Sequence, residues 1–252
     1  EILEKCKKLK VISRHGVGYD NIDTKFLKKN NIKLLVTATT TSVSPAEHIM
    51  FMILSISKGH DFYDQAVRDG KFESIMHMKN NNNFEISNKK ILIVGFGRIG
   101  RKLIKRCLGF EMQVYVYDPF VDKKTIDKYG GVKIENLDEG LKTIDILSLS
   151  VPLTKETHNM INIKKMKLMK KKSIIINTSR GGVVNEIDLN NALNEEIIQA
   201  AGLDVFEKEP PDINNPLLKN KKVFLSPHAA TFTKECLSKM SIETVQNIID
   251  FF

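Results

Sequence analysis

The sequence predicts an α/β protein built on a doubly wound parallel sheet. Short apolar runs, with the length and branching of buried parallel strands, recur along the chain, and helical patterns separate most of them. In addition, residues 89–118 read as one complete βαβ unit, in which a strand, a glycine-rich turn, an amphipathic helix and a second strand follow one another. Strands that alternate with helices imply a parallel sheet covered by helices on both faces.

The individual elements are expected from these patterns in chain order. The strands are expected at residues 9–12, 32–36, 91–94, 114–117, 144–149, 173–177, 200–205 and 223–225. The helices are expected at residues 24–29, from Pro45 through 57, at 99–108, 186–193 and 233–252, and residues 60–88 are polar and irregular in part. Because the helix that begins at Pro45 is apolar on all sides, we expect it to be buried in a domain or against a partner.

The turn of the βαβ unit has the composition of a phosphate-binding loop. Gly95 permits a tight turn, Gly97 lets backbone amides approach a pyrophosphate, and Gly100 lets the helix pack closely on the strand. The helix N-terminus adds unpaired N–H groups and the positive end of the helix dipole. An ordinary glycine-rich turn is the alternative, but the strand and helix on either side favour a dinucleotide site.

The second strand of the unit ends on an acid, Asp118, roughly 20 residues after the glycines, as in dinucleotide-binding units. Its carboxylate is placed to accept hydrogen bonds from the adenine ribose hydroxyls and would repel a 2′-phosphate. The sequence therefore predicts NAD rather than NADP as the cofactor.

Composition excludes several classes of protein. The chain has 252 residues, of which 42% are hydrophobic and 27% charged, as in a soluble globular protein. No apolar run has membrane-spanning length, and the first residues do not resemble a secretory signal. Cys6, Cys107 and Cys236 lack metal-ligand spacing. We therefore expect a cytoplasmic protein with no membrane partner and no metal site.

The net charge of +9 leaves two interpretations. It could mark a nucleic-acid surface, or it could suit an anionic cofactor and an acidic substrate. The lysines are scattered, with short clusters at 164–165 and 170–172, which is typical of solvated faces. We therefore expect no nucleic-acid partner.

Three polar residues follow three consecutive predicted strands. Arg180 comes after 173–177, Glu209 after 200–205, and His228 after 223–225. Ligands of open parallel sheets bind beyond the carboxyl ends of the strands, so we expect the three to converge there. Taken singly, each has a purely structural interpretation, and that interpretation is given to the other histidines, His15, His48, His60, His77 and His158.

The trio suits hydride transfer to a 2-oxo acid. Arg180 offers a planar fork for the substrate carboxylate and could polarise the carbonyl. His228 can protonate the carbonyl oxygen as hydride arrives, or remove the hydroxyl proton in the reverse direction. Glu209, if hydrogen-bonded to the imidazole, would orient it and favour its protonated form.

With these residues in view, the chain from about residue 9 to 252 resembles the D-isomer-specific 2-hydroxyacid dehydrogenase family, which includes D-3-phosphoglycerate dehydrogenases and glyoxylate/hydroxypyruvate reductases. The motifs that carry the resemblance lie at 13–23, 95–100, 177–182, 202–210 and 226–228. The resemblance implies Arg180, Glu209 and His228 as the catalytic residues. It implies cofactor contacts from the glycine loop and from Arg98, Ile99, Asp118, Val151, Pro152, Thr178, Ser179, Arg180, Asp204 and His228.

The resemblance also implies how the substrate and the nicotinamide are held. Backbone amides near Val17 and Gly18 would bind the substrate carboxylate together with Arg180 and His228, and Asp204 would accept from the nicotinamide carboxamide. Where many members have a glycine pair after the histidine, this chain has Ala229-Ala230.

Two domains and a homodimer follow from the same resemblance. A Rossmann-type NAD-binding domain is expected at 46–232, and a partial, flavodoxin-like substrate domain at 1–45, joined by the C-terminal helix 233–252. The family's substrate domain begins with further α/β units, which we expect before residue 1. The helix 46–57 is the usual dimer element.

The expected function is NAD-dependent interconversion of a D-2-hydroxy acid and its 2-oxo acid, with 3-phosphoglycerate or hydroxypyruvate/glyoxylate as the favoured substrates. The alternative is an NAD(H)-sensing interaction protein on the same scaffold, since transcriptional corepressors resemble this family. A nucleic-acid-binding protein is a third hypothesis, and only the charge supports it.

Overall fold

The computed structural model describes residues 2–78 and 82–252. The chain divides into two compact units: unit 1 joins the segment up to Pro45 with Thr231–Phe252, and unit 2 is Ala46–Ala230. Each unit has its own parallel sheet, and each is described below by itself.

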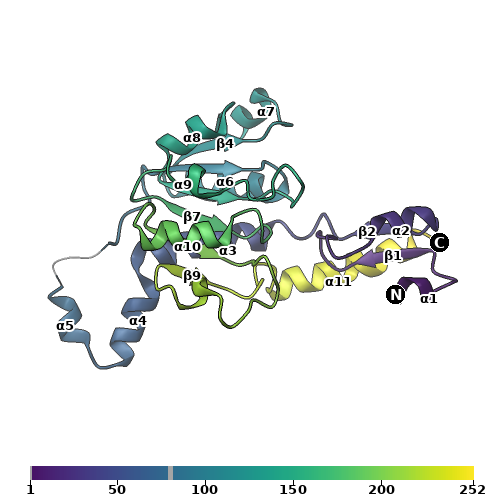
Figure 1. Ribbon diagram of the computed structural model, residues 1–252. Helices are drawn as coiled ribbons and strands as arrows, with labels where there is room; N and C mark the ends of the chain where they lie inside the picture. The colour runs from purple at the N-terminus through teal and green to yellow at the C-terminus, as the bar shows by residue number, and fades with distance from the viewer. Residues whose placement is uncertain (1, 79–81) are drawn as a thin grey trace. The chain divides into compact units, whose positions relative to one another are not determined.

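Unit 2 is built around a seven-stranded sheet in the order β5-β4-β3-β6-β7-β8-β9, with every neighbouring pair parallel (Figure 1). The strands are β3 (Lys90–Val94), β4 (Gln113–Tyr117), β5 (Val132–Lys133), β6 (Ile146–Leu149), β7 (Ile174–Asn177), β8 (Ala200–Leu203) and β9 (Val223–Leu225). The chain runs outward from β3 to β5, returns to β6, and runs outward again to β9. The prediction of a doubly wound parallel sheet is confirmed.

Helices cover both faces of this sheet. One core contains residues of α3 (Val43–Lys58) and α6 (Arg98–Gly109), and the other contains residues of α8 (Leu137–Thr143), α9 (Ile163–Met166) and α10 (Glu186–Asn194). Strand β3 contributes to both, because Ile91 and Ile93 face the first core while Leu92 and Val94 face the second. A central parallel strand with two buried faces needs a continuous apolar run, which is the pattern seen in the sequence.

The apolar helix α3 begins at Val43, two residues before the proline that marks it in the sequence. Ile49, Met52 and Ile53 are fully buried in the core under the sheet. The approach is close, since a Cβ added at Gly202 of β8 would lie 3.3 Å from Cβ of Met52. The chain's own sheet therefore accounts for most of the apolar character of α3.

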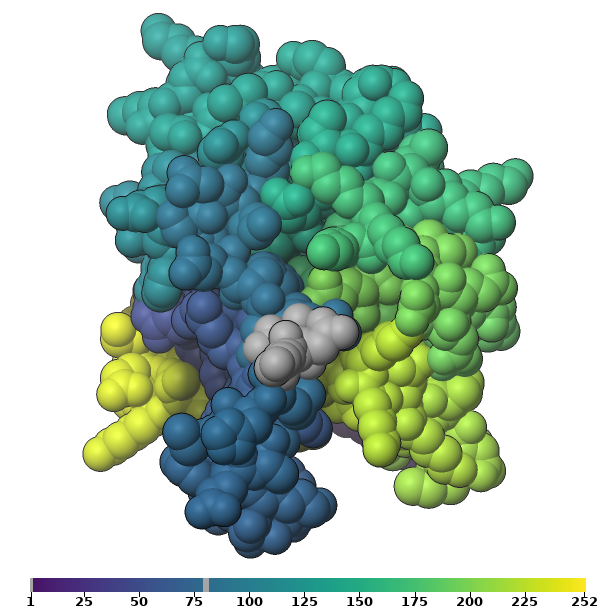
Figure 2. All heavy atoms as spheres, turned by 90° about the vertical axis from the view of Figure 1, so that its left-hand side faces the viewer, coloured from purple at the N-terminus to yellow at the C-terminus, as the bar shows by residue number. Residues whose placement is uncertain are grey.

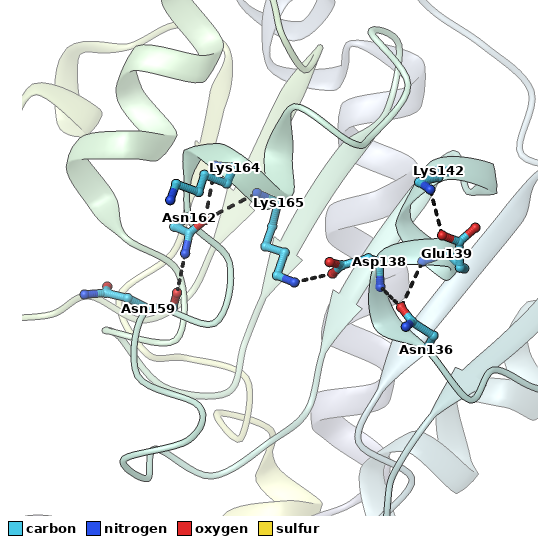
Figure 3. A network of polar contacts seen from close by, with 8 residues as sticks. All are labelled: Asn136, Asp138, Glu139, Lys142, Asn159, Asn162, Lys164 and Lys165. Atoms are coloured by element: carbon cyan, nitrogen blue, oxygen red, sulfur yellow. Dashed lines mark hydrogen bonds and ion pairs between the residues drawn. The ribbon is translucent and has the colours of Figure 1, made fainter.

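Asparagine side chains start the two helices α8 and α9 that cover the second face (Figure 3). The side-chain oxygen of Asn136 accepts from the backbone N–H groups of Asp138 and Glu139, and that of Asn162 accepts from those of Lys164 and Lys165. Such caps satisfy N–H groups that have no partner within the helix. An ion pair between Lys165 and Asp138 then joins the two helices.

Several short elements are not resolved by the sequence patterns. They include α8 and α9, as well as α4 (His60–Arg68), α5 (Phe72–Met76), α7 (Lys123–Lys128), the 3₁₀ helix η1 (Pro216–Lys219) and the two-residue strand β5. Helices α4 and α5 occupy the region described from the sequence as polar and irregular in part, and they project from the body of unit 2 (Figures 1 and 2).

Unit 1 has a parallel pair of strands, β1 (Val11–Arg14) and β2 (Lys33–Val36), with α1 (Ile2–Lys5), α2 (Thr24–Lys29) and α11 (Lys234–Ile249). The C-terminal helix α11 packs on this pair, and Glu243 accepts a hydrogen bond from Thr40 Oγ1 at 2.7 Å. Across residues 2–78 and 82–252, no helix is long and apolar enough to cross a membrane.

Candidate active site

The glycine loop lies at the point where the strand order reverses, between β3 and β6. Gly95 has a φ of +94°, and a Cβ there would lie 2.5 Å from the carbonyl oxygen of Ser150 at the end of β6. A Cβ at Gly100 would lie 2.5 Å from the carbonyl oxygen of Gly95. Any side chain at either position would push the loop, strand and helix apart, so both glycines are required by close backbone approach.

The start of α6 has the features of an anion site. Its N-cap residue, Gly97, provides no side-chain cap, so the first-turn N–H groups remain available to a ligand. A Cβ at Gly97 would meet nothing within 4 Å, which leaves open space over the loop. Nearby, the hydroxyl of Ser150 is buried without a hydrogen-bond partner in the described part of the chain. These features fit a dinucleotide pyrophosphate, with Arg98 and Ile99 in the first turn of the helix.

Asp118 connects the end of β4 to the glycine loop. Its Oδ2 accepts from the backbone N–H of Phe96 at 2.7 Å, and its Oδ1 accepts from that of Phe120 at 2.8 Å. Each carboxylate oxygen can accept more than one hydrogen bond, so the group keeps acceptor capacity for a ribose diol. The carboxylate is therefore held in one position beside the phosphate-binding loop.

Arg180 sits on a loop that Asn177 braces. The side chain of Asn177 accepts from the backbone N–H of Ser179 at 3.1 Å and donates to the carbonyl oxygen of Arg180 at 2.9 Å. Thr178 and Ser179 are buried, whereas Arg180 is half-buried and donates to the carbonyl oxygen of Ser179 at 2.6 Å. The loop after β7 thus presents the guanidinium from a fixed backbone.

The loops after β7 and β8 touch directly. A Cβ added at Gly181 would overlap the carbonyl oxygen of Phe206, so the residue after Arg180 must be glycine for the two backbones to pass. The loop after β8 also contacts the start of α10, because the N–H of Glu207 donates to Oε1 of Glu186 at 2.6 Å. This approach brings the loop of Arg180 alongside the loop that leads to Glu209.

Glu209 and His228 are in contact. Oε2 of Glu209 lies 2.7 Å from Nδ1 of His228, and its Oε1 accepts from the backbone N–H of Phe206 at 3.1 Å. His228 has a left-handed φ of +55° and its side chain is 49% exposed. With Nδ1 directed to the carboxylate, Nε2 is the ring nitrogen that this contact does not use.

Asp204 is the buried centre of the turn that carries His228. Its backbone oxygen accepts from the N–H of His228 at 2.7 Å, and its carboxylate accepts from the N–H groups of Ala229 at 2.8 Å and Ala230 at 3.0 Å and from the hydroxyl of Ser226. Burial raises the pKa of Asp204, but hydrogen bonds from His48, Ser226 and the two amides outweigh it and hold the pKa below its usual value.

His48 is the residue of this network that sequence reasoning missed. It was given a purely structural interpretation, yet its Nε2 lies 2.8 Å from Oγ of Ser226 and 3.4 Å from Oδ1 of Asp204. No local signal marks it, because its hydrogen-bond partner is 178 residues away in the sequence.

The other predicted residues fall in two places. Val151 and Pro152 follow β6, next to the glycine loop. Val17 and Gly18 belong to unit 1, in a loop where Nε of Arg14 donates to the carbonyl oxygen of Gly18 at 3.0 Å. No group of three or more metal-ligating side chains is found in the ranges that the structure describes.

Residues 50–230 match the family described as D-isomer specific 2-hydroxyacid dehydrogenase, NAD binding domain. The chain belongs to this family. The predictions of the family and of NAD as its cofactor are thereby confirmed.

Relatives support the assignment over almost the whole chain. The chain is 36% identical to a D-3-phosphoglycerate dehydrogenase of Archaeoglobus fulgidus over 99% of its own residues and 46% of the relative. It is 36% identical to a glyoxylate reductase of Korarchaeum cryptofilum over 100% of this chain and 75% of that one. It thus spans about half of the first relative's length.

A solved structure shows the same fold. A D-lactate dehydrogenase from Aquifex aeolicus, complexed with NAD and lactic acid, superposes with a TM-score of 0.88 and 32% identity, over 99% of this chain and 78% of that chain.

Proposed function

We propose that the protein interconverts a D-2-hydroxy acid and its 2-oxo acid with NAD. The observation that carries the proposal is the contact of His228 with Glu209 at the carboxyl ends of β8 and β9, beside the loop of Arg180. An imidazole oriented by a carboxylate is a suitable general acid and base, and its place at this edge of the sheet puts it where ligands of doubly wound folds bind.

The residues would divide the work as follows. NAD, when bound, accepts or delivers the hydride. Nε2 of His228 gives its proton to the carbonyl oxygen during reduction and takes it from the hydroxyl during oxidation. Glu209 keeps the ring oriented and stabilises its charged form, and Arg180 pairs with the substrate carboxylate through its planar fork.

The cofactor would be held by groups of unit 2. The amides at the start of α6 would bind the pyrophosphate, and Asp118 would bind the adenine ribose. Val151-Pro152 and Thr178-Ser179 would contact the cofactor between its adenine and nicotinamide ends. Asp204 would accept from the carboxamide, since an ionised carboxylate is an acceptor only. The roles of Val17 and Gly18 toward the substrate stay predictions.

The substrate is proposed to be 3-phosphoglycerate, hydroxypyruvate or glyoxylate. Support comes from the named relatives, which are D-3-phosphoglycerate dehydrogenases, glyoxylate reductases and a hydroxypyruvate reductase. A panel of these acids, with D-lactate added, tests the proposal by following NADH absorbance with the full-length protein. Turnover of one of them supports the proposal; NADH binding without turnover of any acid would overturn it in favour of an NAD(H)-sensing interaction protein.

We further propose a homodimer with α3 at the interface. The apolar surface of α3 that is available for an interface is smaller than the sequence predicts, because most apolar residues of α3 face the sheet of the same chain. Phe51, next to Phe224, remains 48% exposed. Light scattering of the full-length protein at micromolar concentration checks this, and the mass of a single chain would contradict it.

A further inference from the structure

His48 occupies a position that the proposed chemistry does not use. It lies on α3, and its side chain is 16% exposed. Ile49, Met52 and Ile53 of α3 fill the apolar core, whereas His48 directs a ring nitrogen at the hydroxyl of Ser226. His48 thus meets the buried carboxylate of Asp204 in two ways, through the hydroxyl of Ser226 and directly at 3.4 Å, which is a more specific task than filling space.

The direction of these hydrogen bonds follows from the chemistry of the three groups. Asp204 is ionised near neutral pH, because its pKa is lowered, and an ionised carboxylate can only accept. The single proton of Ser226 is therefore given to Oδ1 of Asp204. Ser226 Oγ must then accept from His48, so Nε2 of His48 carries a proton and donates across 2.8 Å.

The hydrogen bonds from His48 through Ser226 end on Asp204, the residue proposed to bind the nicotinamide carboxamide. Asp204 is fully buried and accepts from the amides of Ala229 and Ala230, while its backbone oxygen accepts from the amide of His228. A buried negative charge is costly unless donors surround it, and His48 is the donor contributed from outside the strand ends. Loss of His48 would free Ser226 to turn away and weaken the support of this carboxylate.

We propose that His48 is a positioning residue of the cofactor site, which acts through Ser226 to hold Asp204 ionised and aimed at the nicotinamide carboxamide. The inference rests on the proposed function, in which Asp204 accepts from that amide. It extends that proposal to a residue of α3 that would act on the cofactor through other side chains of this chain.

The test compares two cofactors that differ only at the amide. NADH carries a carboxamide NH₂ that can donate to Asp204, whereas the reduced 3-acetylpyridine analogue has a methyl group there. For His48→Leu in the full chain, we expect the dissociation constant for NADH to rise by roughly tenfold, the worth of about one hydrogen bond to a charged group. The dissociation constant for the analogue should change less than twofold. Both are measured by fluorescence titration, so no turnover is needed.

Two further variants separate positioning from general damage. His48→Gln places an amide donor near the former Nε2 and should restore most of the preference for NADH. Glu47 lies next to His48 on α3 and forms an ion pair with Arg106 of α6. Glu47→Leu removes this ion pair and should leave both dissociation constants unchanged. Equal losses for the two cofactors in His48→Leu, or no loss for NADH, would overturn the role of His48. Failure of the unmodified chain to bind NADH would instead overturn the proposed function, and this role with it.

Discussion

Nδ1 of His228 lies 2.7 Å from Oε2 of Glu209, and the other oxygen of Glu209 accepts from the backbone amide of Phe206 at 3.1 Å. The carboxylate is therefore anchored on one side while it holds the imidazole on the other. Phe206 lies three residues after the end of β8 at Leu203, and the backbone oxygen of Asp204 in the same segment accepts from the N–H of His228. The contacts that orient His228 therefore come from the segment that directly follows β8.

Glu209→Gln tests this anchoring. Glutamine can keep the geometry but not the negative charge that stabilises the imidazolium needed for reduction. We expect kcat for oxo-acid reduction at neutral pH to fall by roughly tenfold or more, within the range that a positioned acid contributes. Steady-state kinetics give the value, with NADH affinity as the control, since Glu209 is not placed among the cofactor contacts. An unchanged kcat would remove Glu209 from the mechanism.

Asp118→Ala tests cofactor choice. The carboxylate that would bind the ribose diol and repel a 2′-phosphate is lost, so the ratio of kcat/KM for NAD over NADP should fall by about one to two orders of magnitude. NAD itself should also bind less well, because the amides of Phe96 and Phe120 lose their acceptor. The ratio is therefore the decisive quantity. If the unmodified protein uses both cofactors with equal efficiency, the role of Asp118 is wrong.

Asp204→Asn should lower the free energy of unfolding by about 1–3 kcal/mol at neutral pH, because an amide cannot accept from all the donors around it. The pH dependence follows from the lowered pKa of Asp204. Because the pKa is lower in the folded protein, ionised Asp204 stabilises the fold at pH values above the ordinary aspartate pKa of ~3.9. This stability is lost as the pH falls through the folded-state pKa. The difference between the two proteins should thus shrink below pH ~4. Urea unfolding at several pH values measures it, and a difference independent of pH would contradict the account.

The sequence predicts local features of this structure well. The two strands of the βαβ unit, expected at 91–94 and 114–117, are found there, and each begins one residue earlier in the structure. Such strands can be predicted because a buried parallel strand shows as a short apolar run in the chain. Strand β8, expected at 200–205, ends at Leu203. The N–H of Asp204 still donates to the carbonyl oxygen of Asn177 in β7, but its own backbone oxygen and its carboxylate accept from the turn after β9.

Features that depend on distant contacts are the ones that the sequence leaves open. Glu209 and His228 are 19 residues apart, and only their positions after neighbouring strands suggested that they meet. His48 and Ser226 are 178 residues apart, and no periodicity, cap or motif links them. Short elements such as β5, with two residues, carry too few side chains to form a pattern.

The central claim is that His228 moves the proton, and one variant tests it most directly. Because His228 has a φ of +55°, asparagine is a better replacement than alanine, since it tolerates the left-handed conformation and leaves the turn intact. The measurement is kcat for oxo-acid reduction by His228→Asn, with NADH affinity determined on the same sample. We predict a loss of roughly 10²–10⁴-fold in kcat with NADH still bound. Near-normal turnover by this variant would contradict the mechanism.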